Sequence, residues 1–146
     1  MKIVAKNKRA RFDYEILEQI EAGILLTGQE VKSARAGNIN LSGSYVSFAS
    51  GKPVLKNASI QPYKYASNLA DYNPDQDREL LLKKKELSRL IGLSQENGIS
   101  VMPLEVRSAR TIKVLIGAGR GRKKHDKRNR IKERDVDRRL RKGEEI

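Results

Sequence analysis

The last thirty residues of the chain most constrain how it can fold, because they offer almost nothing to a hydrophobic core. From Gly117 to Ile146 there are thirteen Lys or Arg and six Asp or Glu, so this segment carries +7 of the formal net charge of +13. Its apolar residues are Ala118, Ile131, Val136, Leu140 and Ile146. Ordering a residue costs roughly 1–2 kcal/mol of backbone entropy, which so few apolar side chains cannot offset. We therefore expect a basic tail that is disordered when free and ordered by a polyanion, usually nucleic acid; a solvated tail that only maintains solubility is the alternative.

The remaining part, about 115 residues, is long enough for one compact domain. Its first 11 residues are basic, and we expect them to lie across a surface. Residues 14–26 mix β-branched, aromatic and charged side chains, which predicts a long strand with a bend or bulge at Gly23. Thr27 and Glu30 match a capping box, so we predict a helix over residues 29–36 that ends at Gly37.

The rest of the body predicts short strands and one more helix. Apolar residues recur at helical spacing over residues 84–97, and Ile112, Val114 and Ile116 alternate as in a half-buried strand. The expected strands cover residues 45–49, 53–56, 59–63, 99–106 and 111–116, with loops at 65–77 and 107–110. Short strands of this kind favour a closed or nearly closed antiparallel barrel over a sandwich, because closure removes exposed edges. We place a hinge at residues 117–119, which divides the chain into a domain of residues 1–118 and a tail of residues 119–146.

Composition excludes several kinds of chemistry. The chain has no Cys and one His, which excludes a disulfide framework, a thiolate zinc site, a Cys nucleophile and a multi-histidine metal site. No stretch has the apolar length of a signal peptide or a membrane span, so we expect a cytoplasmic protein. No phosphate-binding glycine loop or nucleophile constellation is present, which indicates a protein that is not an enzyme.

Cations are distributed through the body as well as the tail, and a shared surface for them would bind nucleic acid. Glu21 is either an exposed strand carboxylate or an acceptor for a base edge or ribose hydroxyl, and Glu30 is interpreted as the capping-box partner. Leu81 is more often a core residue than a ligand contact. His125 lacks a rigid partner for catalysis, and its ring fits stacking on a base better.

Five blocks of sequence together carry a resemblance to a known family. They are NKRARFDYEI, EAGILLTGQEVKSARAG, the pair Ser44-Tyr45, RELLLKKKEL and KKHDKR. In this order and spacing they closely resemble the SsrA-binding protein family, also called small protein B. The resemblance covers about Val4 to Asp135. It implies a mainly β fold, a small antiparallel oligonucleotide-binding-like (OB-like) barrel with two or three flanking helices.

The same resemblance implies a non-enzymatic adaptor of trans-translation that needs no cofactor or metal. Such an adaptor binds the tRNA-like domain of transfer-messenger RNA (tmRNA) and delivers it to stalled ribosomes. The implied partners are tmRNA, the small ribosomal subunit with its rRNA, and elongation factor Tu through the tmRNA complex. The alternative is a ribosomal or rRNA-binding structural protein, which would share the basic surface.

The resemblance also implies which residues bind RNA. Family residues with this role match Glu21, Leu81 and Lys113, and the neighbouring contacts expected are Asn7, Lys8, Arg9, Lys32, Arg35 and Lys83. The tail is expected to occupy the decoding centre and to form a helix in the empty mRNA channel, through Arg122, Lys123, His125, Asp126, Lys127 and Arg128. Val136 stands where many members carry an aromatic residue, and the 107–110 turn is one residue shorter than is common.

Overall fold

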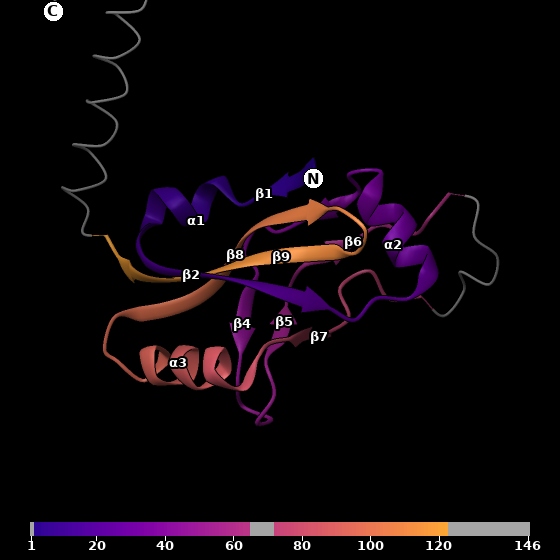
Figure 1. Ribbon diagram of the computed structural model, residues 1–146. Coiled ribbons are helices and arrows are strands. Elements are labelled where there is room, and N and C mark those ends of the chain that lie inside the picture. Colours follow the sequence, from indigo (N-terminus) through magenta and orange to yellow (C-terminus); the bar gives the residue numbers. More distant parts are fainter. Residues whose placement is uncertain (1, 65–71, 123–146) are drawn as a thin grey trace, which may run out of the picture.

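The computed structural model describes residues 2–64 and 72–122 and places them in one curled β-sheet with three flanking helices (Figure 1). The helices are α1 (Lys8–Asp13), α2 (Gly28–Arg35) and α3 (Lys84–Ser94). The strands are β1 (Lys2–Lys6), β2 (Tyr14–Ile24), β3 (Ile39–Asn40), β4 (Tyr45–Ser47), β5 (Val54–Lys56), β6 (Ser59–Ile60), β7 (Arg78–Leu81), β8 (Ile99–Ser108) and β9 (Ile112–Gly121). The predicted mainly β class with flanking helices is confirmed.

Seven strands form one antiparallel sheet in the order β1-β8-β9-β2-β7-β5-β4, and β3 pairs with β6. Among the described residues β4 also packs beside β8, so the sheet curls back on itself as a partly open barrel. Its interior is filled by a cluster that includes Leu55, Ile60, Leu80, Val106 and Ile116, all 1% exposed or less. Each of these side chains comes from the inward-facing row of a strand, which is the alternation expected of a sheet with one buried face.

Helix α2 begins with the capping box that the sequence predicts. The Thr27 hydroxyl accepts a hydrogen bond from the Glu30 amide at 3.3 Å, and Glu30 Oε1 accepts one from the Thr27 amide at 3.0 Å. Gly37 follows the C-cap with φ +86°, a conformation that glycine adopts without strain. The predicted helix and its two ends are therefore confirmed.

The expectation for the first segment is wrong, since residues 2–13 do not simply lie across a surface. Residues 2–6 pair with β8 as an edge strand, and Asn7 caps the short helix α1 by accepting a hydrogen bond from the Ala10 amide at 3.2 Å. Below α1 lies a second apolar cluster, in which Ala10 packs with Met102, Leu104 and Leu115 on the outer face of the sheet.

The predicted bulge at Gly23 is also wrong. Gly23 keeps regular pairing with β7 and β9, and the register of β2 shifts instead between Ile16 and Glu18. Leu17, the extra residue of that bulge, is 46% exposed. The missing side chain at Gly23 serves packing, because a Cβ there would lie 3.2 Å from the Cβ of Leu81.

The predicted hinge at residues 117–119 lies in the middle of a strand. Strand β9 continues to Gly121 and pairs with β2 and β8 through this stretch, and Gly117 and Ala118 are buried. The glycines allow close approach: a Cβ at Gly117 would lie 2.7 Å from Leu104 Cδ1, and one at Gly119 would lie 3.0 Å from the Glu15 carbonyl oxygen. The hinge is therefore wrong, and the proposed division of the chain moves to the end of β9.

Candidate nucleic-acid interface

Three of the predicted RNA-binding residues share the outer face of the sheet. Gly23 on β2 pairs with Leu81 on β7 and with Lys113 on β9, and Lys113 pairs in turn with Arg107 on β8. Directly paired residues of antiparallel strands project to the same face, and residue i+2 follows them. Glu21, two residues before Gly23, therefore belongs to this face too. We call the set Glu21, Gly23, Leu81, Arg107 and Lys113 the outer row.

The outer row combines an exposed apolar side chain with exposed charges. Leu81 is 49% exposed, whereas its neighbour Leu80 on the opposite face is 1% exposed and belongs to the core. Since Gly23 has no side chain, Leu81 lies directly against the backbone of β2. The interpretation of Leu81 as a core residue, which is the usual role of leucine, is therefore wrong.

Glu21 is held by an arginine that the sequence did not single out. Arg107 Nη1 donates to Glu21 Oε2 at 3.3 Å, and Arg107 Nε donates to Glu105 Oε2 at 2.9 Å. The hydrogen bond to Glu105, together with the charges of Glu105 and Glu21, raises the pKa of Arg107 above its ordinary value. A longer β8 in the prediction would have revealed this residue, because strand pairing past Val106 sets Arg107 opposite Lys113.

Helix α1 holds a second group of predicted residues, Asn7, Lys8 and Arg9. The side chain of Asn7 is buried: its Nδ2 donates to the Pro103 carbonyl at 2.9 Å while its Oδ1 caps the helix. Asn7 therefore has a structural role, which positions α1 on β8. Lys8 and Arg9 are exposed, and Arg9 Nε donates to Asp13 Oδ2 at 2.9 Å.

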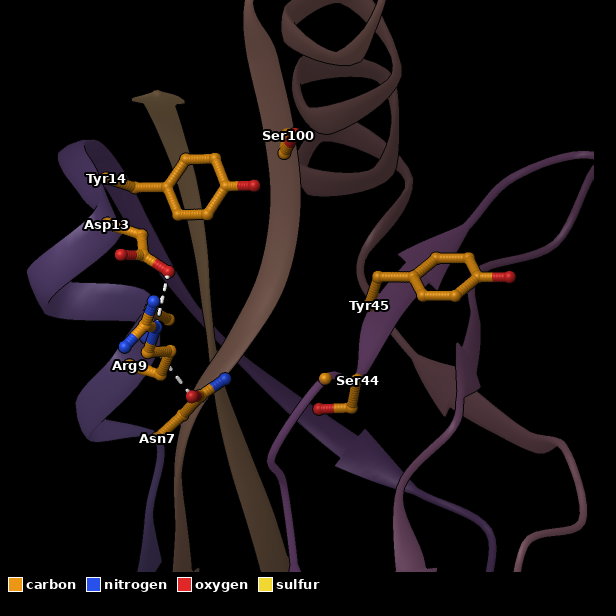
Figure 2. Close-up of a pocket in the computed structure, with 9 residues that line it drawn as sticks. Asn7, Arg9, Asp13, Tyr14, Ser44, Tyr45 and Ser100 are labelled. Carbon is orange, nitrogen blue, oxygen red and sulfur yellow. Dashed lines mark hydrogen bonds and ion pairs between the residues drawn. The ribbon is translucent and has the colours of Figure 1, made fainter. Parts of the chain in front are cut away.

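A hollow of about 310 Å³ lies between α1 and the segment that enters β4 (Figure 2). Figure 2 shows the Tyr14 ring directed toward Ser100 on β8, while the Tyr45 ring points away from α1. The two tyrosines therefore do not form a pair of stacking walls. This agrees with the irregular spacing of tyrosines in the sequence, which gave no reason to expect a stacking platform.

The predicted residues on α2 lie near the turn between β8 and β9. Arg35 Nη1 donates to Ser108 Oγ at 2.9 Å and to the Ala109 carbonyl at 2.7 Å, and Nη2 donates to the Arg110 carbonyl at 3.0 Å. Arg35 thus clamps the turn that precedes Lys113. Lys32, one turn earlier, has its Nζ 5.7 Å from the centre of the Tyr63 ring. Lys83 stands apart from α2, exposed two residues after Leu81 at the N-cap of α3.

Arg122, predicted as a tail residue, belongs to the body. Its backbone amide donates to the Asp13 carbonyl at 2.8 Å, which ties the end of β9 to the end of α1. The other predicted tail residues, Lys123, His125, Asp126, Lys127 and Arg128, lie outside the described residues.

Glu30 lies in a buried network and not on the interface. Its Oε2 accepts hydrogen bonds from Arg78 Nε at 2.8 Å, from Gln76 Nε2 at 3.1 Å and from the Tyr72 hydroxyl at 3.3 Å. Burial acts to raise the pKa of Glu30, but the hydrogen bonds from Thr27, Gln76 and Arg78 and the charge of Arg78 outweigh it and lower that pKa. The interpretation of Glu30 as a capping residue is confirmed, with Arg78 as a partner that local sequence could not reveal.

Metal and membrane sites were also considered. Residues 2–64 and 72–122 contain no group of three or more His, Cys, Asp or Glu that could hold a metal ion. In the same ranges no helix has the length and apolar character needed to cross a bilayer.

The geometry defines a class, the small antiparallel β-barrels that present charged residues on a strand face beside short helices. Comparison with known proteins narrows that class. The profile of the family described as SmpB protein matches residues 4–145. The chain belongs to the SmpB family.

Individual relatives agree with the family profile. The chain is 48% identical over 140 residues to the SsrA-binding protein of Lactobacillus acidophilus, covering 95% of this chain and 92% of the relative. It is 45% identical over 141 residues to the SsrA-binding protein of Synechococcus sp. strain JA-3-3Ab, covering 96% and 92%. A chain in the solved structure described as "tmRNA-SmpB: a journey to the center of the bacterial ribosome" is 45% identical, with a TM-score of 0.68 over 84% of this chain and 85% of that one.

Proposed function

We propose that this protein is a non-enzymatic RNA-binding adaptor of trans-translation, which binds the tRNA-like domain of tmRNA and delivers it to stalled ribosomes. Membership of the SmpB family supports this, as do the relatives named for SsrA binding and the similar chain described with tmRNA and the bacterial ribosome. The ribosome as partner also supports a cytoplasmic location.

The observation that carries the proposal is the convergence of Glu21, Leu81 and Lys113. These residues are far apart in sequence, yet the pairing of β7, β2 and β9 brings them to one face around Gly23. They are the three positions that the family resemblance implicates in RNA binding. A chance distribution over a barrel would give no such row.

Each of the three side chains offers a different kind of contact to RNA. Lys113 provides a cation for phosphate, which contributes affinity without sequence preference. Leu81 provides an exposed apolar surface for a base or a sugar. Glu21 accepts hydrogen bonds and repels phosphate, so it favours ribose hydroxyls or base amines. The combination suits a folded RNA with a defined shape better than a uniform phosphate backbone.

Other parts of the chain have proposed roles that extend from this surface. Lys8, Arg9, Lys32 and Lys83 are exposed and provide further phosphate contacts, while Asn7 and Arg35 support α1 and the β8–β9 turn. Lys123, His125, Asp126, Lys127 and Arg128 act in the decoding centre, and the following residues form a helix in the empty mRNA channel. Elongation factor Tu joins through the tmRNA complex.

A binding experiment tests the proposal. The purified full-length protein is titrated against a transcript of the tmRNA tRNA-like domain and against bulk tRNA at a fixed salt concentration, because electrostatic affinity depends steeply on salt. We expect tighter binding of the tRNA-like domain. Equal affinity for the two RNAs would contradict the proposal.

A second experiment tests the division of the chain. A variant that ends after Arg122 keeps every described strand, so we expect its affinity for the tRNA-like domain to match that of the full chain. Peptide tagging on stalled ribosomes should be lost. A collapse of RNA affinity in this variant would show that the last 24 residues contribute to the first binding step.

A further inference from the structure

Four charged side chains form a continuous line from α1 across the outer face to β2. Arg11 Nη2 donates to Glu105 Oε1 at 3.4 Å, Glu105 Oε2 accepts from Arg107 Nε at 2.9 Å, and Arg107 Nη1 donates to Glu21 Oε2 at 3.3 Å. We call Arg11, Glu105, Arg107 and Glu21 the charge line. It connects the helix that carries Lys8 and Arg9 with the outer row.

The charge line is formally neutral, although the whole chain carries +13. Two guanidinium groups alternate with two carboxylates, so each cation already faces an anion. Lys113, paired directly opposite Arg107, adds a positive charge at one side of the line. A phosphate therefore gains more from Lys113 than from Arg107, whose field the two carboxylates cancel.

The pairing leaves one acceptor of the charge line available to a ligand. Both oxygens of Glu105 are engaged by arginines, and Glu105 is only 8% exposed. Glu21 uses Oε2 for Arg107, and within residues 2–64 and 72–122 no group donates to its Oε1. The side chain of Glu21 is 41% exposed, so this oxygen is accessible from outside.

We propose that Arg107 is a positioning residue, which fixes the Glu21 carboxylate so that Oε1 accepts a hydrogen bond from a donor on the bound RNA, a ribose 2′-hydroxyl or an exocyclic base amine. The inference rests on the proposed function and assigns a specificity role within that surface. A free glutamate side chain would sample several rotamers and repel nearby phosphates. Ion pairing with Arg107 both restricts that motion and compensates the charge.

Arg107 in turn depends on Glu105 and Arg11 for its orientation. Its side chain is 27% exposed, and Glu105 holds it through the shorter of its two hydrogen bonds. The line therefore makes the position of Glu21 depend on the packing of α1 against β8. Lysine at position 107 could not reproduce this, because one ammonium group lacks the two divergent donors of a guanidinium.

The experiment compares Arg107→Ala, Arg107→Lys, Glu21→Gln and the double variant Arg107→Ala/Glu21→Gln in full-length protein. Affinity for the tRNA-like domain transcript is measured over a series of salt concentrations. We expect each single variant to lose about tenfold in affinity, the size of one charge-assisted hydrogen bond. The double variant should lose no more than either single variant, because both changes remove the same contact.

Salt dependence separates a positioning residue from a phosphate contact. A positioning role leaves the slope of log affinity against log salt unchanged. If Arg107 contacts phosphate, the slope falls by about 1 and binding of poly(U) weakens equally. That result, additive losses in the double variant, or unchanged affinity in Arg107→Ala would each overturn the inference.

Modified transcripts distinguish the two possible donors. One set carries 2′-deoxynucleotides and another carries inosine in place of guanosine, which removes the exocyclic amine. One of the two sets should weaken binding to the unsubstituted protein without weakening the binding of Glu21→Gln further. If neither set does so, the predicted hydrogen bond to Glu21 is absent.

The matched control is Arg89→Ala. Arg89 Nη2 donates to Glu18 Oε2 at 2.7 Å in another exposed pair that joins α3 to β2, away from the outer row. This variant should bind RNA as the unsubstituted protein does. Failure of the unsubstituted protein to prefer the tRNA-like domain would contradict the proposed function itself, whereas normal preference with unaffected Arg107 variants would contradict only the role of Arg107.

Discussion

Two glutamate–arginine pairs in this protein illustrate how burial decides what an ion pair does. Glu30 and Arg78 are 2.8 Å apart with both side chains 2% exposed, while Glu21 and Arg107 are 3.3 Å apart with side chains 41% and 27% exposed. The buried pair joins α2 to β7 and to the segment before it. The exposed pair leaves an acceptor oxygen facing outward, where a ligand can reach it.

The remaining contacts of Arg78 explain why this pair can be buried at all. Its Nη1 donates to the carbonyls of Ala58 and Gln76, and its Nη2 donates to the carbonyl of Pro74. Every polar group of the pair is thus satisfied inside the protein, which offsets the cost of removing two charges from water. Arg107 has no such set of carbonyl partners among the described residues, and water can approach it. The difference predicts that one pair stabilises the fold and the other shapes the interface.

The largest expected effect is that of Arg78→Ala. It leaves the Glu30 carboxylate buried without its charge partner and removes the hydrogen bonds that hold residues 58, 74 and 76, so we expect a loss of about 3–5 kcal/mol in the free energy of unfolding. Arg107→Ala should cost about 1 kcal/mol or less, as exposed pairs do. Urea denaturation measures both. Equal losses would remove the distinction between the two pairs.

The next effect is on binding. Lys113→Glu places a negative charge opposite Arg107 in the outer row, so we expect roughly tenfold or greater loss of affinity for the tRNA-like domain and a salt slope reduced by about 1. The free energy of unfolding should change little, because Lys113 lies on the outer face. Lys52→Glu makes the same charge change on a side chain that is 69% exposed and pairs with Glu79, and it should have a smaller effect. Equal effects of the two variants would make net charge, rather than position, the cause.

The pH dependence of stability sharpens the comparison further. Because the pKa of Glu30 is lower in the folded protein than its ordinary value of 4.5, the ionised carboxylate stabilises the folded state above that value. This contribution is lost as the pH falls from 4.5 through the lowered pKa. Acid titration of unfolding should therefore show a smaller loss over this range in Glu30→Gln, which is already destabilised at neutral pH. Parallel curves for the two proteins would contradict the role given to Glu30.

The smallest expected effect is that of Gly23→Ala. The added Cβ would lie 3.2 Å from Leu81 Cβ, so Leu81 must shift outward, at a cost of about 1 kcal/mol in stability. The same shift should alter RNA affinity, since Leu81 and Glu21 lie on either side of Gly23 in the outer row. Thermal unfolding and RNA titration measure the two effects. Gly28→Ala is a suitable control, because nothing lies within 4 Å of a Cβ at that position.

Sequence reasoning succeeded where the signal was local. The capping box needed only Thr27 and Glu30, and the period of two in β9 needed only alternate residues. Arg78 was missed because it lies 48 residues from Glu30, and no local pattern connects an arginine after a loop with a glutamate in a helix. Arg107 was missed for a similar reason, since its partner Glu21 lies 86 residues away.

The errors also follow from tertiary structure. Glycines at 117 and 119 indicated a hinge, but their function is to admit the side chain of Leu104 and the backbone of β2. The first residues have too few apolar side chains to predict a strand, and β1 exists because β8 offers an edge for it. Asn7 gave a cap signal for α1 that the high density of cations obscured. The grouping of Glu21, Leu81 and Lys113 depended on family resemblance, because strand pairing between distant segments cannot be obtained from spacing.

The bond between the Arg122 amide and the Asp13 carbonyl has a mechanical consequence. It fixes the point of departure of the last 24 residues on the rigid part of the molecule, next to the helix that carries Lys8 and Arg9. Tension applied to those residues from outside is therefore delivered to α1 and to the strand beneath it, like a rope tied at a bracket instead of at a loose strap. A ribosome that pulls on one end of this protein would, through that knot, also turn the RNA carried at the other.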